Sequence, residues 1–357
     1  MFSKESFHDS VIRWFRGCIL VGALSTFMAT ACAGERELLG ARMVERSRIS
    51  MGSQLRLVAW TRDEPAALDT FEHIFREFDR LEGLLSVWKD GSDVVRLNRA
   101  AGEAPIAVSR ETIEVLDAAH EASVWTGGKF DITFGALADL WKFDHDQDNV
   151  IPDRAAIEKR LPLVNFEEVV TDRAAGTAFI RKRGMRVHLG GIGKGYAVDR
   201  AVALLKQRGF NDFMIQSGGD LYVAGSNGGQ PWKLAIADPR GTHEPFATLQ
   251  IGDGTFSTSG DYERSFVKDG VRYHHLIDPD RGEPARGSRS VTIVTNRATL
   301  ADVLSTGVFI LGPDAGMALI EKMPDVEGVI VTATNQVLVS SGLKGRVKFV
   351  ATPTDAP

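Results

Sequence analysis

Residues 185–208, MRVHLGGIGKGYAVDRAVALLKQR, predict a strand, a glycine-rich turn and a helix in direct succession. The predicted strand covers residues 185–189 and the turn covers residues 190–195. In the helix that follows, apolar residues recur at the spacing of one helical face, at Val198, Ala201, Val202 and Leu205. Gly209 is suited to end this helix, because glycine readily adopts the left-handed conformation that follows a helix C-terminus.

The glycine-rich turn has two interpretations. A helix N-terminus preceded by glycines presents free N–H groups and a positive dipole end, which suit a phosphate. A tight structural turn would have the same composition. The turn is not a Walker A loop, because Lys194 is followed by Gly195 instead of Ser or Thr, and it lacks the dinucleotide fingerprint because Tyr196 stands at the last glycine position.

The rest of the chain mixes helices and strands without a regular alternation, which favours an α+β fold over a doubly wound α/β fold. Helical periodicity predicts helices at residues 65–85, 109–124, 298–311 and 314–322. Strands are predicted at residues 51–60, 212–216, 219–224, 231–236, 246–251, 271–277, 290–295, 327–332 and 336–339. We expect a loop with a short helix facing a ligand at residues 123–143, and a frayed tail at residues 351–357.

Composition excludes several classes of protein. The 357 residues allow one large domain or two ordinary ones. Lys and Arg together number 42 and Asp and Glu number 47, and this net charge of −5 argues against a nucleic-acid partner. The two cysteines are Cys18 and Cys32, so a cysteine nucleophile, a Cys-ligated metal and an internal disulfide are excluded from the chain after residue 32.

Residues 1–31 have the pattern of a secretory signal peptide, with basic residues followed by the apolar stretch 17–31. That stretch is shorter than the roughly 20 residues of a membrane-spanning helix. Two processing outcomes are open: a lipoprotein signal with lipidation of Cys32, or cleavage after Ala33. We therefore expect a periplasmic protein, which lipidation would anchor to the inner membrane.

Three further features carry candidate chemistry, each with a structural alternative. Asp302 and Thr306 share one face of a predicted helix, and their oxygens suit Mg²⁺; alternatively Thr306 bonds its own helix and Asp302 is a solvated charge. His275 is either a base or a structural histidine. Trp88 either stacks on a flat ring or anchors a surface segment. The sequence 258–262, TSGDY, predicts a polar turn, which either approaches a ligand or is only a structural turn.

The order of several motifs along the chain resembles the ApbE family. These are VHLGGIGKGYAVDRAVALLKQRG, SGGDLYVAG, PWKLAIADPR, STSGDY, RYHHLIDPDRGEPA and ADVLSTGVFILG, with FDRLEGLLSVWKDGSDVVRLN and GGKFDITFGALADLW upstream. The resemblance covers residues 45–345 and leaves 346–357 as a C-terminal tail. It implies a T-fold-related fold of mixed sheets with packed helices, in a single catalytic unit.

The resemblance also implies a function. Family members are FAD:protein FMN transferases that use Mg²⁺, transfer FMN from FAD to a Ser or Thr hydroxyl of an acceptor protein, and release AMP. The expected acceptor is a respiratory or redox membrane protein. Two alternatives remain: a pyrophosphatase that splits FAD to FMN and AMP, and a flavin-binding lipoprotein without turnover.

Site residues follow from the matching positions. The resemblance assigns metal ligation to the Gly191 carbonyl, Asp302, Ser305 and Thr306. It assigns FAD contacts to Met51, Trp88, Lys129, Phe130, Asp131, Lys194 and Ile277, and the role of candidate base to His275. The chain departs from the family at His188, where Asp is usual, at Trp88, where Tyr is common, and at Asp220, where Glu is frequent. A neutral His188 still hydrogen-bonds a ribose or a base edge, so it stays among the FAD contacts.

Overall fold

The computed structural model describes residues 40–144, 146–241 and 244–356, and these belong to one compact unit. The predicted signal peptide and Cys32 lie outside the described residues. None of the helices within the described ranges is both long and apolar enough to cross a membrane.

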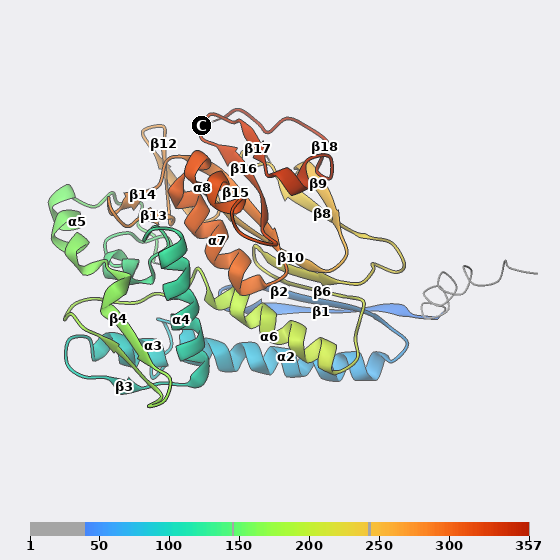
Figure 1. The fold of residues 1–357 in the computed structure, drawn as a ribbon, viewed down its shortest axis with the longest axis horizontal. Coiled ribbons are helices and arrows are strands. Elements are labelled where there is room, and N and C mark those ends of the chain that lie inside the picture. Colours follow the sequence, from blue (N-terminus) through green and yellow to red (C-terminus); the bar gives the residue numbers. More distant parts are fainter. Residues whose placement is uncertain (1–39, 145, 242–243, 357) are drawn as a thin grey trace, which may run out of the picture. The chain divides into compact units, whose positions relative to one another are not determined.

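An eight-stranded antiparallel sheet forms the centre of the fold (Figure 1). Its strands, in spatial order, are β1 (Arg42–Ser50), β2 (Ser53–Thr61), β6 (Phe213–Ser217), β7 (Asp220–Ala224), β10 (Gly254–Gly260), β15 (Ser288–Thr295), β16 (Glu327–Thr332) and β17 (Val337–Val339). Because side chains alternate along each strand, the sheet buries a different set of residues on each face.

Helices cover one face of this sheet (Figure 1). They are α2 (Glu64–Leu85), α3 (Asp93–Arg99), α4 (Arg110–Trp125), α6 (Gly193–Gln207), α7 (Ala298–Leu311) and α8 (Pro313–Ile320). The largest buried side chains of α2, among them Phe71 and Phe78, pack into this layer with Leu55 and Leu57 of β2. The helical periodicity of residues 65–85 therefore corresponds to a buried apolar stripe, as predicted.

A second, smaller sheet covers the opposite face. It has the order β18-β9-β8, with β8 (Trp232–Ala237), β9 (Pro245–Ile251) and β18 (Lys348–Phe349). Trp232, Phe246 and Leu249 pack there against Val58 of β2 and Phe256 of β10. The central sheet is therefore enclosed between helices and a sheet, which confirms the predicted α+β class.

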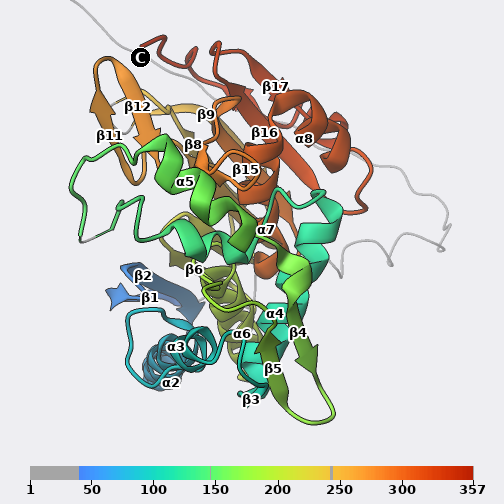
Figure 2. The same ribbon diagram turned by 90° about the vertical axis from the view of Figure 1, so that its left-hand side faces the viewer.

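The remaining elements gather at one end of the central sheet (Figure 2). They are β3 (Ile106–Ala107), β4 (Val169–Asp172), β5 (Thr177–Ile180), β11 (Ser265–Lys268), β12 (Val271–His274), β13 (Ile277–Asp278), β14 (Glu283–Pro284), α5 (Arg154–Arg160) and the 3-10 turns η1 (Ile132–Leu137), η2 (Leu161–Leu163) and η3 (Phe166–Glu168), while η4 (Ser341–Leu343) follows β17. Trp141, Phe143, Phe266 and Ile277 form a separate apolar cluster among them. This cluster joins the segment after η1 to the β11–β12 hairpin.

Local signals explain how the helices near the site begin and end. Asp199 of α6 accepts hydrogen bonds from the backbone N–H groups of Ala298 at 2.7 Å and Thr299 at 2.8 Å, so α6 caps the N-terminus of α7. Gly209 has φ +83° after the end of α6, and the N–H of Phe210 donates to the carbonyl of Leu205, as expected for a glycine that ends a helix.

Three structural predictions are wrong. Residues 185–189 form no strand, because the backbone of Val187 bonds the side chain of Asn98 and the N–H of His188 donates to the carbonyl of Ile132. The segment 258–262 begins inside β10, in the middle of the central sheet, and is not simply a polar turn. The tail at 351–357 is not frayed over its described part, since Thr354 is hydrogen-bonded to Asp238.

Candidate functional site

A cavity of about 410 Å³ lies where the glycine-rich turn, α7, β10 and the segment around η1 meet. Among its lining residues are nearly all the predicted site residues: Trp88, Lys129, Phe130, Asp131, His188, Gly191, Lys194, His275, Ile277, Asp302 and Thr306. Met51 lines an adjoining cavity of about 460 Å³, which shares Trp88, His188, Lys194 and Arg264 with the first. Ser305 lines neither cavity. The fold thus brings together residues from most of the chain.

Asp302 of α7 is held in place by the start of α6. Its Oδ2 accepts a hydrogen bond of 2.9 Å from the backbone N–H of Gly195, and the residue is 4% exposed. Burial, reinforced by the Asp220 carboxylate, raises the pKa of Asp302 to about 7, and Lys194 opposes this increase. The alternative that Asp302 is a solvated surface charge is therefore wrong.

Lys194 and Asp220 form an ion pair on the cavity wall. Nζ of Lys194 lies 3.0 Å from Oδ2 of Asp220, whose Oδ1 accepts a hydrogen bond of 2.6 Å from Ser257. Burial alone would lower the pKa of Lys194, but the two carboxylates of Asp220 and Asp302 outweigh it and raise this pKa. Lys194 therefore stays cationic at the cavity and is available to a phosphate.

Hydroxyl groups from β10 meet α7 beside Asp302. Ser259 Oγ lies 2.8 Å from Ser305 Oγ and 3.2 Å from Thr306 Oγ1. Ser305 also donates to the carbonyl of Asp302 at 2.9 Å, so its hydroxyl serves its own helix. Thr306 contacts Ser259 of β10 and lines the cavity. Ser305 is buried and does not line the cavity.

The same region offers oxygen atoms to a hard cation. A Cβ atom added at Gly191 would lie 3.5 Å from Thr306 Oγ1 and 3.3 Å from the Phe130 ring, so the bare glycine backbone approaches the hydroxyl. No three His, Cys, Asp or Glu side chains cluster as a metal site anywhere in the described ranges. A metal here would rely on the Asp302 carboxylate, the Thr306 hydroxyl and backbone carbonyl oxygen, a donor set that suits Mg²⁺.

His275 lies on the cavity wall in a neutral state. Its backbone N–H donates to the carbonyl of Arg264 at 3.1 Å, and Nδ1 is buried without a hydrogen-bond partner in the described part of the chain. Burial lowers the pKa of His275 to about 3, and the positive charges of Arg264 and Lys194 act in the same direction. A bound phosphate anion would offset those charges and make the ring a stronger base.

His188, which replaces the family's usual Asp, makes a specific local contact. The backbone N–H of Gly190 donates to Nδ1 of His188 at 3.1 Å, so Nδ1 is the acceptor and the ring proton is on Nε2. Burial lowers the pKa of His188, which keeps the ring neutral. An Asp side chain at residue 188 would also accept a hydrogen bond from the N–H of Gly190. The imidazole therefore preserves the turn but lacks the negative charge.

The remaining predicted FAD contacts form the floor and rim of the cavity. Lys129 bonds Asp278 at 2.7 Å and Asp280 at 2.8 Å, which ties its segment to the β13–β14 turn. Asp131 uses its carboxylate within the protein, accepting from the N–H groups of Thr133 and Phe166. Trp88 is 57% exposed and lines both cavities, so it is a rim residue and not a half-buried anchor.

Sequence reasoning missed several residues of the cavity wall. Ser257 and Ser259 lie on the helix-facing side of β10, and Arg264 pairs with Asp144 at 2.6 Å where the two cavities adjoin. The segment GTFSTSG at 254–260 consists of small and hydroxyl residues around the single apolar residue Phe256, so it lacks the apolar alternation that would have indicated a strand.

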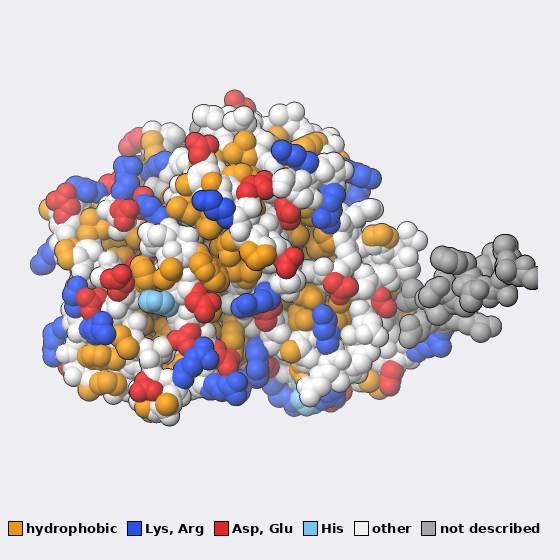
Figure 3. Space-filling view, in the orientation of Figure 1, with side chains coloured by type: hydrophobic (Ala, Val, Ile, Leu, Met, Phe, Trp, Pro, Cys, Tyr) orange, Lys and Arg blue, Asp and Glu red, His pale blue; other side chains and the backbone are white. Residues whose placement is uncertain are grey.

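The surface carries no single-sign field on the face shown in Figure 3, where Lys and Arg alternate with Asp and Glu. This distribution agrees with the absence of a basic surplus in the composition. The cavity lining is mixed as well, because Lys194 and Arg264 lie beside the carboxylates of Asp220 and Asp144 with which they pair.

Comparisons with known proteins identify the family to which the chain belongs. The chain is 32% identical to the FAD:protein FMN transferase of Treponema pallidum over 96% of this chain and 97% of the relative, and 32% identical to one from Klebsiella pneumoniae over 84% and 92%. Its fold is similar to the crystal structure of the ApbE protein of Thermotoga maritima, with a TM-score of 0.79, 32% identity and coverage of 85% of this chain and 99% of that one. The flavin transferase ApbE of Vibrio cholerae matches with a TM-score of 0.77, 28% identity and coverage of 86% and 99%. Residues 51–330 match the profile of the ApbE family, and the chain therefore belongs to that family.

Proposed function

We propose that this protein is an FAD:protein FMN transferase that depends on Mg²⁺ and modifies a Ser or Thr hydroxyl of an acceptor protein. The observation that carries the proposal is that the same cavity is lined by Asp302, Thr306, Lys194 and His275. The relatives from Treponema pallidum and Klebsiella pneumoniae are FAD:protein FMN transferases, which supports it.

The reaction exchanges the phosphoanhydride bond of FAD for a phosphoester bond to the acceptor. The acceptor hydroxyl oxygen forms a bond to the phosphorus of the FMN half of FAD, and the bond from that phosphorus to the bridging oxygen breaks. AMP leaves with the bridging oxygen, and the hydroxyl proton passes to a base. In-line attack of this kind requires positioning and neutralisation of negative charge more than covalent chemistry by the protein.

The residues of the cavity divide this work. Lys194 supplies a cation to the pyrophosphate, and the N-terminus of α6 adds the positive end of the helix dipole, although the N–H groups of Gly193 and Gly195 are already bonded within the protein. His275 takes the hydroxyl proton, which requires that the bound substrate raise its pKa from the low value of the ligand-free chain. Trp88 and Phe130 offer aromatic faces to the flat rings of FAD.

The donor set beside Asp302 fits a magnesium ion. Asp302, Thr306 and the Gly191 carbonyl would hold it, while Ser305 and Thr306 both contact the hydroxyl of Ser259. When bound, the ion neutralises pyrophosphate charge. The pKa of Asp302 is raised because the carboxylate is buried and lies near the Asp220 carboxylate. A nearby divalent cation would favour the charged form of Asp302.

The acceptor and the location of the protein complete the proposal. The acceptor is a respiratory or redox membrane protein, and the enzyme acts in the periplasm after removal of residues 1–31. Lipidation of Cys32 anchors it to the inner membrane. Cell fractionation of the wild-type chain and of Cys32→Ser tests this placement, because only the wild-type chain should remain with the membrane.

The decisive test is incubation of the mature chain with FAD, Mg²⁺ and a candidate acceptor. Covalent flavin fluorescence on the acceptor, with one AMP released per flavin attached, supports the transferase. FMN in solution without labelled acceptor supports a pyrophosphatase instead. Tight FAD binding without AMP release under any divalent metal would show a flavin-binding protein without turnover and overturn the proposal.

A further inference from the structure

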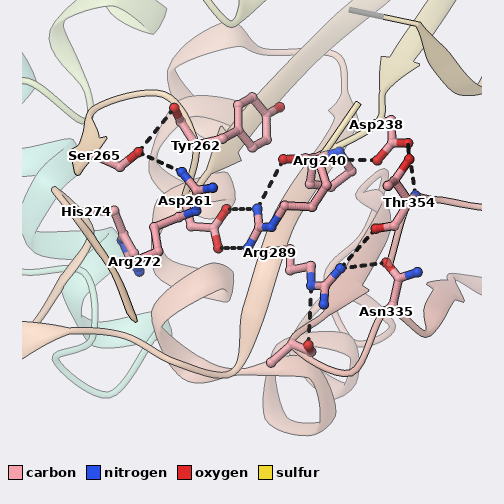
Figure 4. Close-up of polar contacts among 12 residues, drawn as sticks. Asp238, Arg240, Asp261, Tyr262, Ser265, Arg272, His274, Arg289, Asn335 and Thr354 are labelled. Carbon is pink, nitrogen blue, oxygen red and sulfur yellow. Dashed lines mark hydrogen bonds and ion pairs between the residues drawn. The ribbon is translucent and has the colours of Figure 1, made fainter. Parts of the chain in front are cut away.

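A buried ion pair outside the cavity connects two of the sequence motifs to the site (Figure 4). Arg240 ends the motif PWKLAIADPR, and Asp261 lies in the motif STSGDY. The guanidinium donates to both carboxylate oxygens, at 2.7 Å to Oδ1 and 2.8 Å to Oδ2, and the two side chains are 7% and 9% exposed. Neither residue lines either cavity, so their function is not contact with the substrate.

Asp261 begins the turn that leads from β10 to the cavity wall. The backbone N–H of Asp261 donates to the carbonyl of Arg289 at 3.0 Å, so the turn is fixed through both its backbone and its side chain. Directly before it, Gly260 leaves room for the Tyr262 ring, which a Cβ atom would approach to 2.4 Å. The conformation of residues 260–262 is therefore determined by packing and by the ion pair together.

The end of this turn contacts the proposed base. Glu263 and Arg264 line the cavity, and the carbonyl of Arg264 accepts the hydrogen bond from the backbone N–H of His275. The Arg264 side chain pairs with Asp144 on the opposite wall. A displacement of Asp261 would thus move the Arg264 carbonyl, to which the backbone N–H of His275 donates.

The C-terminal segment around Thr354 is linked to the Arg240–Asp261 pair through Asp238. Asp238 accepts from the backbone N–H of Arg240 at 3.0 Å and from the N–H of Thr354 at 2.9 Å. Arg289 donates to the carbonyl of Thr354 at 3.1 Å (Figure 4), and Asn335 donates to the carbonyl of Pro353 at 2.6 Å. The last described residues are therefore bound to the loop that carries Arg240.

We infer that Arg240 and Asp261 are positioning residues for the transfer reaction, which fix the 261–264 turn and through it His275, and that residues 353–355 stabilise this arrangement. The inference rests on the proposed function for its kinetic consequence. A bidentate guanidinium–carboxylate pair fixes orientation as well as distance, which a single-point contact does not.

The test uses Arg240→Lys, which keeps the charge and loses the two-pronged contact. We expect kcat for FMN transfer to fall by about 10- to 100-fold, while KM for FAD changes by less than about threefold, because a small misplacement affects the reaction more than binding. Asp93→Asn is the matched control. Asp93 is also buried and accepts from Ser109, Thr112 and Arg96, but lies away from both cavities. It should lower Tm and leave kcat of the folded enzyme unchanged.

A second measurement separates this inference from the proposed function. The ¹⁵N chemical shifts of the His275 ring should change in Arg240→Lys and stay the same in Asp93→Asn, whether or not the wild-type chain transfers FMN. Failure of wild-type transfer with an altered His275 signal would reject the function alone. Unchanged kcat and unchanged His275 shifts in folded Arg240→Lys would overturn the inference. If that variant does not fold, Asp238→Ala decides by the same two measurements, since Asp238 is outside the buried pair.

Discussion

The backbone N–H of Gly195 donates a hydrogen bond of 2.9 Å to the carboxylate of Asp302, and this bond joins the first turn of α6 to the middle of α7. The close approach depends on the glycine. A Cβ atom at residue 195 would lie 2.5 Å from the carbonyl oxygen of Ala298 and 2.7 Å from Cβ of Asp302. The glycine-rich turn therefore serves helix packing and the position of the carboxylate at once.

Gly195→Ala should force α6 and α7 apart. We expect a loss of about 1–3 kcal/mol in the free energy of unfolding, as for overpacking elsewhere, together with reduced turnover because Asp302 moves. Gly193→Ala is the control, since its Cβ would meet nothing nearer than Leu85 at 4.0 Å. Urea denaturation of both variants checks this. Equal stability of the two would contradict the packing argument.

Asp302→Ala should separate binding from turnover. FMN transfer should fall at least about 100-fold, as when one group that stabilises developing charge is removed, while FAD still binds through Trp88, Phe130 and Lys194. Flavin fluorescence measures binding, and AMP release measures turnover. Asp314→Ala, an exposed change on α8, should leave both unaffected. Wild-type turnover in Asp302→Ala would show that the metal ligands lie elsewhere.

The raised pKa of Asp302 predicts a pH-dependent stability of the metal-free chain. With a folded pKa of about 7 against the ordinary value near 3.8, the folded state binds more protons between these limits. The contribution of Asp302 to stability is therefore complete below about pH 4 and is lost as the pH rises through about 7. Asp302→Asn should raise Tm in EDTA at about pH 8 and change it less at about pH 5. Equal shifts at both values would argue against this assignment.

His188 should be neutral, with its proton on Nε2, throughout the neutral range. The hydrogen bond from Gly190 fixes Nδ1 as the acceptor, and burial lowers the pKa of the ring. Two-bond ¹H–¹⁵N spectra distinguish the two tautomers directly, and the titration midpoint should lie below the ordinary value of about 6.5. His188→Asn retains an acceptor for the N–H of Gly190 and should keep Tm closer to that of the wild type than His188→Ala. A midpoint above 6.5 would disprove the assignment.

The sequence predicted those parts of the site that depend on local periodicity. Asp302 and Thr306 were placed on one helix face by their spacing, and the structure puts both on the cavity wall. The long amphipathic helix at 65–85 and the strands with apolar alternation were found for the same reason. In each case the pattern and the burial have one cause, namely the geometry of a single element.

The features that the sequence did not predict depend on contacts between segments that are distant along the chain. The strand β10 carries mostly small and hydroxyl residues, so its burial between α7 and the β8–β9 sheet is not visible from apolar alternation. Residues 185–189 pair with the side chain of Asn98, which no strand signal describes. The hydrogen bonds from Thr354 to Asp238 and from Gly190 to His188 join polar groups that no sequence pattern identifies as partners.

The order of strands in the central sheet has a consequence for how the chain folds. β2 pairs with β6 in a register that joins Leu55 to Ser217, about 160 residues away. The inner edge of the β1–β2 hairpin can therefore pair only after about three fifths of the 357 residues, up to Ser217, have been synthesised. Such non-local pairing slows folding, because the loop has to close before its contacts are gained. The cavity, whose lining residues run from Gly52 to Ile310, is assembled only after most of the polypeptide has been synthesised.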